Sequence, residues 1–316
     1  MSSEMSDFLV APAGKDTQRH VNYDGADIHF RLRRTARAGA PLVIRFHGAV
    51  QRDKRELPAF QANLAAFDGV AHQISVCDPT MMARDGFSCS WYAGTEDLDV
   101  QRILGRFLGE VQDTLEPSRT IYLGSSGGGF GALYHSYHDP GSIALVMVPQ
   151  TNLRQHFVPA AVKRYLDACW SGRTLDEVAE LTCVDLPGLY SAGYGNTVIY
   201  VQSQGDFRHN ALQLKPFMGA CLQDGDPSSQ RFILASDYWG KPGHGGAVPA
   251  EGYTPWLRAA LDAASPESED VLAAYSAIRS RDSSGEPVPK PASARGFTPA
   301  DFSFAQNLTR ALKGNS

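Results

Sequence analysis

Short apolar runs alternate along this chain with longer segments in which apolar residues recur at helical spacing. This order is typical of a mostly parallel sheet whose strands are joined by crossover helices. The runs that predict buried strands lie at 41–48, 72–79, 120–124, 143–149, 196–204 and 231–239. The segments that predict helices lie at 57–67, 97–115, 127–138, 211–222 and 253–264. The pattern therefore favours an α/β fold with helices on both faces of a central sheet.

A hairpin is expected ahead of these units. Residues 21–23 and 28–34 have strand character, and Asp24-Gly25 between them suits a tight type I′ turn. The hairpin would add an antiparallel edge to the sheet.

Two segments depart from the alternation. Residues 151–195 hold two helical stretches, more chain than one crossover needs, so we expect a helical cap there. Residues 283–296 are rich in Pro, Ser and Gly, as linkers are, and 297–314 favour a terminal helix. We therefore expect a main domain over 1–265 and a C-terminal helical extension over 266–316.

Composition narrows the class of protein. Of 316 residues, 43% are hydrophobic and 20% charged, the balance of a globular protein with a sizeable core. The net charge of −5, from 34 acidic and 29 basic side chains, favours neither nucleic acid nor an anionic membrane as a partner.

The cysteines and the start of the chain bear on metals and location. The five cysteines are scattered and form no CxxC pair, so we expect reduced structural thiols and no metal site. The first residues carry acids and lack an apolar export core, and no run of about 18 apolar residues follows. We therefore expect no membrane span and a cytoplasmic location.

The segment GSSGG at 124–128 contains a candidate nucleophile, Ser126. A predicted strand precedes it and a predicted helix follows, which is the context in which a sharp turn lifts a serine hydroxyl out of a sheet. A glycine-rich phosphate loop is the alternative. The dinucleotide fingerprint fails because position 126 is serine, and the Walker pattern fails because no Lys-Ser or Lys-Thr follows the glycines.

A serine nucleophile needs a base, and the base needs an acid to orient it. His244 lies in KPGHGG after the last predicted strand, and Asp206 follows the strand before it, which gives the chain order Ser, Asp, His. Asp237 and Asp185 are weaker candidates for the acid. Packing, surface or loop roles are expected for the other histidines considered, His20, His29, His72, His135, His138 and His209.

Acyl transfer also needs donors for the developing oxyanion. The backbone N–H of Gly127, after the nucleophile, and that of Ala49, in FHGAV after an early strand, are the candidates. His47 in the same segment is expected to support this loop and not to titrate in catalysis.

The segments FHGAV, GSSGG, QGD and GHGG occur in the order found in the α/β-hydrolase superfamily, and the matching region covers about 40–265. The chain resembles this superfamily, which implies its fold and the triad of Ser126, Asp206 and His244. More narrowly, the elbow with DPT at 78–80 and SWYAG at 90–94 resembles hydrolase-fold proteins of bacterial surface-polysaccharide systems, including capsule O-acetyltransferases and accessory secretion proteins. That likeness implies that Trp91, Tyr92 and Asp78 line a sugar or acyl pocket, with core packing as the alternative.

Three functions are open at this point. The first is a serine esterase that forms an acyl-enzyme on a small-molecule ester or an acylated carbohydrate, without a cofactor. The second is an O-acetyltransferase that moves acetyl from acetyl-CoA, as co-substrate, to a glycan hydroxyl. The third is a non-catalytic accessory protein, against which the intact triad argues. We expect the esterase.

Overall fold

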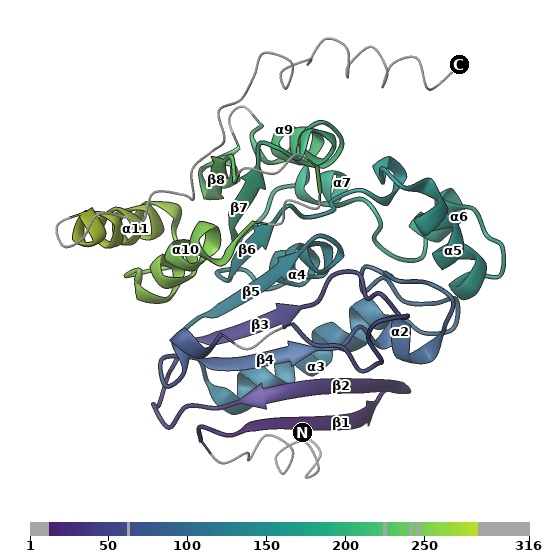
Figure 1. The fold of residues 1–316 in the computed structure, drawn as a ribbon, viewed down its shortest axis with the longest axis horizontal. Helices are drawn as coiled ribbons and strands as arrows, with labels where there is room; N and C mark the ends of the chain where they lie inside the picture. Colours follow the sequence, from purple (N-terminus) through teal and green to yellow (C-terminus); the bar gives the residue numbers. More distant parts are fainter. Residues whose placement is uncertain (1–12, 62–63, 224–225, 240–242, 245–247, 284–316) are drawn as a thin grey trace. The chain divides into compact units, whose positions relative to one another are not determined.

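The computed structural model describes residues 13–283 apart from 62–63, 224–225, 240–242 and 245–247. These residues form one eight-stranded sheet in the order β1-β2-β4-β3-β5-β6-β7-β8 (Figure 1). The strands are β1 Asp16–Tyr23, β2 Ala26–Arg33, β3 Leu42–Phe46, β4 His72–Val76, β5 Thr120–Ser125, β6 Ile143–Met147, β7 Thr197–Ser203 and β8 Phe232–Asp237. Strands β3 to β8 are parallel, whereas β2 is antiparallel to β1 and β4. The predicted α/β class and mostly parallel sheet are confirmed.

Helices cover both faces of the sheet, as the sequence predicts. They are α2 Pro79–Ala83, α3 Val100–Leu115, α4 Gly127–Tyr137, α5 Pro159–Cys169, α6 Leu175–Ala179, α7 Leu186–Tyr190, α8 Phe207–His209, α9 Lys215–Cys221, α10 Ala250–Asp262 and α11 Ser268–Ser283. One core cluster packs α3 and α4 against Ile44 and Phe46 of β3, and a second packs α10 against the opposite face (Figure 1). Because β3 is covered on both faces, every residue in it is buried, and its sequence is a nearly continuous apolar run.

The opening hairpin forms at the predicted turn. Asp24 and Gly25 both have positive φ, 50° and 85°, as a type I′ turn requires. Asp24 tolerates this region because its short polar side chain costs little there, and glycine has no Cβ to clash.

The predicted helix over 57–67 is wrong, because the only helical turn described within it is the 3₁₀ turn Ala65–Phe67. Two backbone N–H groups of this segment donate to side chains of β4 instead of to the segment's own carbonyls. The N–H of Gln61 donates to Ser75 Oγ at 3.1 Å, and that of Leu64 donates to Gln73 Oε1 at 3.2 Å. Buried polar side chains on the strand thus accept N–H groups that a helix would pair with its own carbonyls.

The predicted helix at 211–222 exists but is divided in two. Its first part, Asn210–Leu214, has π-helical hydrogen bonding, and Lys215–Cys221 continues as α9. Pro216 has no N–H to give to the carbonyl one turn earlier, which accounts for the change of hydrogen bonding at this junction.

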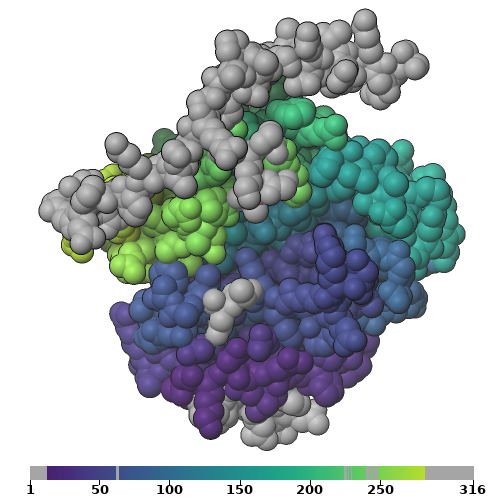
Figure 2. All heavy atoms as spheres, in the orientation of Figure 1, coloured from purple at the N-terminus to yellow at the C-terminus, as the bar shows by residue number. Residues whose placement is uncertain are grey.

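Between β6 and β7, residues 151–195 contain α5, α6 and α7, so the predicted helical insertion is present. In Figure 2 the teal atoms of this segment cover a continuous area at the right of the view. The part of α7 nearest β7 packs on α9 and α4, so the insertion is anchored to the main core.

The compact unit to which the sheet belongs extends past 265, to Ile278. Val271 of α11 is buried, and Tyr275 stacks on Trp256 of α10 with ring centroids 3.7 Å apart. The linker predicted at 283–296 lies outside the described residues except at its first position, and the terminal helix predicted at 297–314 lies wholly outside them. No helix in the described part of the chain combines the length and the apolar character needed to cross a bilayer.

Candidate active site

The turn between β5 and α4 places Ser126 at the carboxyl edge of the sheet. Its backbone has φ 52° and ψ −124°, a conformation that residues with a Cβ rarely adopt. Hydrogen bonds with the end of β6 and the segment after it hold it there: Ser126 N–H donates to Met147 O at 3.1 Å, and Gln150 N–H donates to Ser126 O at 3.0 Å. The strained turn is therefore built into the sheet.

The glycines around Ser126 are required by close backbone approach. A Cβ on Gly124 would lie 2.2 Å from Gly128 O, and one on Gly128 would lie 2.3 Å from Phe46 O. Without these side chains, the first turn of α4 packs directly on the ends of β5 and β3. This is why the glycine-rich pattern marked the turn in the sequence.

Ser126, His244 and Asp206 come together from three separate segments. Ser126 Oγ lies 3.0 Å from His244 Nε2, and His244 Nδ1 lies 2.9 Å from Asp206 Oδ2. In the tautomer that satisfies both contacts, the serine hydroxyl donates to Nε2 and Nδ1–H donates to the carboxylate. The His244 side chain is 29% exposed and that of Asp206 is 2% exposed, so the imidazole faces the surface and the acid lies behind it.

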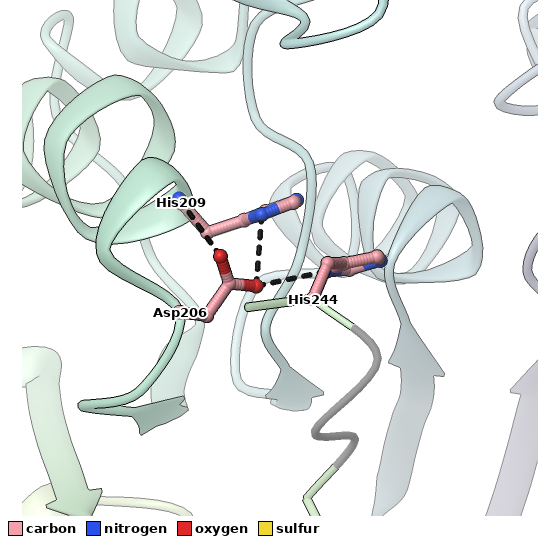
Figure 3. Close-up of side chains that lie close together, drawn as sticks. All are labelled: Asp206, His209 and His244. Atoms are coloured by element: carbon pink, nitrogen blue, oxygen red, sulfur yellow. Dashed lines mark hydrogen bonds and ion pairs between the residues drawn. The ribbon is translucent and has the colours of Figure 1, made fainter. Parts of the chain in front are cut away.

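Asp206 is fixed by the start of α8, which it caps. Its Oδ1 accepts the N–H of His209 at 3.2 Å, leaving Oδ2 directed at His244 (Figure 3). Burial alone would raise the pKa of Asp206, but the contacts with His209 and His244 outweigh it and hold that pKa below its ordinary range. The carboxylate is therefore ionised at neutral pH.

His209 is a member of this cluster that the sequence interpretation missed. Its Nδ1 lies 2.9 Å from Asp206 Oδ2, and its ring stacks on that of His244 with centroids 4.1 Å apart and planes 11° apart (Figure 3). The side chain is fully buried. The available signal was the spacing of Asp206 and His209, which puts an acid at a helix N-cap and a histidine one turn later.

The loop after β3 lies against the nucleophile turn. A Cβ built on Gly48 would stand 3.6 Å from Ser126 Cβ, which shows how close the two segments are. Ala49, the next residue, is exposed. His47 holds this loop: its Nδ1 bonds Gly48 O at 2.7 Å and its Nε2 accepts Asp78 N–H at 2.9 Å. Burial lowers the pKa of His47, which keeps it neutral. The oxyanion role of Gly127 and Ala49 stays a prediction.

A cavity of about 210 Å³ opens beside Ser126 and His244. Met147 and Val148 from the end of β6 and Val248 ahead of α10 give it an apolar wall. Its other lining residues are Gln61, Ser125 and Tyr253. A short apolar group attached to a carbonyl at Ser126 would fit here.

Trp91, Tyr92 and Asp78, expected to line the substrate pocket, instead lie in the core. They are 1%, 2% and 1% exposed. The Asp78 carboxylate accepts from Thr80 N at 2.9 Å, and from Ser90 Oγ and Tyr92 N at 2.7 Å each, so its acceptor capacity is used in folding the loop. The expectation that these three side chains face a substrate is therefore corrected to a structural role.

Trp91 supports the nucleophile turn indirectly, through Gln150. Trp91 Nε1–H donates to Gln150 Oε1, and the backbone N–H of the same glutamine donates to Ser126 O. The indole thus supports the segment that holds the strained turn in place.

Asp206, His209 and His244 also have side-chain atoms of the kinds that bind metal ions. Among the described residues, these three form the cluster that could hold one. Two ligands of a tetrahedral zinc ion with bonds of about 2.0–2.1 Å stand about 3.3 Å apart. The 2.9 Å contact between His244 Nδ1 and Asp206 Oδ2 is shorter, so its spacing fits a shared proton better than a bridging metal.

The solved structures similar to this chain include the following three. A capsule O-acetyltransferase of Neisseria meningitidis serogroup A matches with TM-score 0.53 and 14% identity over 85% of this chain and 97% of its own. The Pyrococcus horikoshii acylaminoacyl peptidase matches with TM-score 0.53 and 11% identity over 94% and 46%. A glycosylation associate protein complex from Streptococcus agalactiae matches with TM-score 0.50 and 16% identity over 70% and 42%. No protein-family model and no curated protein matches the sequence.

The strand order and the placement of the site define the fold. Ser126 follows β5, Asp206 follows β7 and His244 follows β8, all at the carboxyl edge of the sheet. This is the arrangement of the α/β hydrolases. The protein therefore has the α/β-hydrolase fold, and its resemblance to hydrolase-fold proteins is confirmed at the level of fold.

Proposed function

We propose that this protein is a serine esterase that acts through an acyl-enzyme intermediate on Ser126. The observation that carries the proposal is the continuous chain of contacts from Ser126 Oγ to His244 Nε2, at 3.0 Å, and from His244 Nδ1 to Asp206 Oδ2, at 2.9 Å. A serine hydroxyl is a weak nucleophile at neutral pH unless a base accepts its proton. The strained backbone at Ser126 supports the same proposal, because such strain is concentrated at functional sites.

The reaction follows from the contacts. Ser126 Oγ attacks the ester carbonyl carbon while its proton moves to His244 Nε2, and Asp206 stabilises the resulting imidazolium through Nδ1–H. The carbonyl oxygen, now negative, accepts the N–H groups of Gly127 and Ala49. The imidazolium then gives its proton to the departing alkoxide, which leaves as the alcohol. Water, deprotonated by His244, attacks the acyl-enzyme and releases the acid and free Ser126.

The acyl group in this proposal is short. The cavity of about 210 Å³ beside Ser126 is smaller than the roughly 300–1,000 Å³ of pockets that enclose drug-sized ligands. Its apolar wall at Met147, Val148 and Val248 favours a hydrocarbon chain of a few carbons.

Replacement of Ser126 tests the proposal. Ser126→Ala should abolish turnover of p-nitrophenyl acetate and labelling by a fluorophosphonate probe, while the thermal unfolding temperature stays near that of the parent. Ser125→Ala is the matched control, since it removes the adjacent hydroxyl that lines the same cavity and should retain labelling. Unchanged turnover in Ser126→Ala would refute the triad assignment, whereas no turnover and no labelling in the parent protein would favour a non-catalytic accessory role.

The second candidate is transfer of an acetyl group from acetyl-CoA to a glycan hydroxyl. The structural match that spans 97% of the Neisseria meningitidis capsule O-acetyltransferase supports it, through likeness of fold. Both candidates use the same acyl-enzyme and differ in the group that accepts the acyl chain. Incubation with acetyl-CoA and candidate glycans, followed by mass spectrometry, separates them: CoA release that depends on the acceptor identifies the transferase.

A further inference from the structure

We propose that His209 is a positioning residue for His244: lying flat against that ring and sharing Asp206 with it, His209 fixes the plane in which the general base works. The proposal deepens the esterase function proposed above and rests on it. Figure 3 shows that both imidazoles contact the carboxylate of Asp206.

His209 is held by the fold, independently of His244. Asp206 and His209 belong to one helical turn, in which the backbone N–H of His209 donates to Asp206 Oδ1 at 3.2 Å and that of Asn210 donates to Asp206 O at 3.0 Å. The acid and the second histidine are therefore a rigid pair attached to the end of β7. His244 comes from a different segment, joined nearby by the hydrogen bond from Gly243 N–H to Gly205 O at 2.7 Å.

The rings of His209 and His244 are stacked, and the ring of Phe157 packs against both at an angle. The imidazoles of His209 and His244 lie 4.1 Å apart at 11°, close to parallel. Phe157, from the inserted segment, contacts both, with centroids 5.1 Å from His209 and 5.6 Å from His244. A ring that is packed on one face and hydrogen-bonded at both nitrogens has little freedom to rotate away from Ser126.

His209 does not compete with His244 for the aligned hydrogen bond to Asp206. His209 Nδ1 lies 2.9 Å from Oδ2, yet neither of its ring nitrogens has an aligned hydrogen-bond partner among the described residues. Burying an imidazole without such partners costs free energy of folding. Its position here therefore calls for a role other than stability. Its contact with Asp206 stabilises the ionised carboxylate, and its ring supports the base.

Burial is the main reason that His209 stays neutral, because it lowers the pKa of this imidazole. The titratable groups that face it are Asp206, His244 and His156, and buried Tyr200 lies near the carboxylate. Burial lowers the pKa of His209, the contact with Asp206 opposes this, and repulsion from His244 adds to it. A neutral ring can lie against the imidazolium that forms on His244 without like-charge repulsion.

Three substitutions separate stacking from polarity. His209→Phe keeps a flat ring, His209→Gln keeps a polar group without the stack, and His209→Ala removes both. We expect kcat for p-nitrophenyl acetate to fall at least 10-fold in the Ala and Gln variants, to stay within about 3-fold in the Phe variant, and KM to change little. His135→Phe, a buried histidine of α4 that is stacked on Phe46, is the matched control and should leave kcat unchanged.

The pH profile gives a readout that loss of packing alone would not move. Without the polar group of His209, Asp206 directs its charge at His244 alone, so the acid limb of kcat/KM should move up by about 0.5–1 pH unit in the Phe and Ala variants. Wild-type kcat and pH limb in the Ala variant, or equal kcat losses in Phe and Ala, would overturn the proposal. If the Ala variant does not fold, the Gln and Phe pair decides on the same criteria. Loss of activity in Ser126→Ala with unaffected His209 variants would reject this inference and leave the esterase proposal standing.

Discussion

Asp206→Asn tests whether the acid controls the tautomer of His244. Asp206 Oδ1 accepts the backbone N–H of His209, so an asparagine at this position keeps its carbonyl oxygen on that donor. Its NH₂ group then takes the place of Asp206 Oδ2, the atom that lies 2.9 Å from His244 Nδ1. A donor there forces the imidazole to carry its proton on Nε2, where it can no longer accept the proton of Ser126.

The expected loss is large and confined to catalysis. A wrong tautomer in a triad of this kind costs about 10³–10⁴ in kcat, or about 4–5.5 kcal/mol of activation free energy at 1.36 kcal/mol per factor of ten. Because asparagine also caps helices well, the thermal unfolding temperature should change little. The assay is steady-state hydrolysis of p-nitrophenyl acetate at pH 7, with thermal unfolding followed by circular dichroism.

A matched control exists in Asp185, which caps α7 by accepting Gly188 N–H as Asp206 caps α8. Asp185→Asn makes the same chemical change at a cap that belongs neither to the triad nor to the lining of the cavity beside Ser126, and it should keep full activity. More than a tenth of wild-type kcat in Asp206→Asn, or an equal loss in Asp185→Asn, would refute the reasoning.

Three further predictions follow from the same geometry. Gly128→Ala should lower stability by at least about 2 kcal/mol in urea unfolding, because its Cβ would lie 2.3 Å from Phe46 O, whereas Gly109→Ala meets no atom within 4 Å and should be neutral or stabilising. Met147→Ala should enlarge the cavity and move the preferred p-nitrophenyl ester to a longer acyl chain in an acetate-to-octanoate series, and an unchanged preference would place the acyl group elsewhere. Because the pKa of Asp206 is lowered on folding, its contribution to stability is present above the unfolded value of about 4 and lost as pH falls below it, so the free energy of unfolding in urea should fall further for the wild type than for Asp206→Asn between pH 7 and pH 3.

Local patterns in the sequence determined most of the sheet and the order of the site. Strands β3, β6 and β7 are buried along their whole length and are mainly apolar runs, which can be located without knowing their neighbours. The glycines around Ser126 and the chain order of Ser126, Asp206 and His244 placed the candidate triad, because this fold brings the ends of β5, β7 and β8 to one edge.

Only the tertiary structure decided which polar groups are satisfied across the sheet and which side chains are buried. Residues 57–67 have helical periodicity, but Ser75 and Gln73 of β4 accept the backbone N–H groups of Gln61 and Leu64, which a helix would pair with its own carbonyls. Trp91 has the chemistry of a sugar-binding residue, yet the fold turns it inward beneath the nucleophile turn. His209 acquires its relation to His244 only when α8 and a distant loop meet over Asp206, because contacts between segments far apart in the chain leave no local pattern in the sequence.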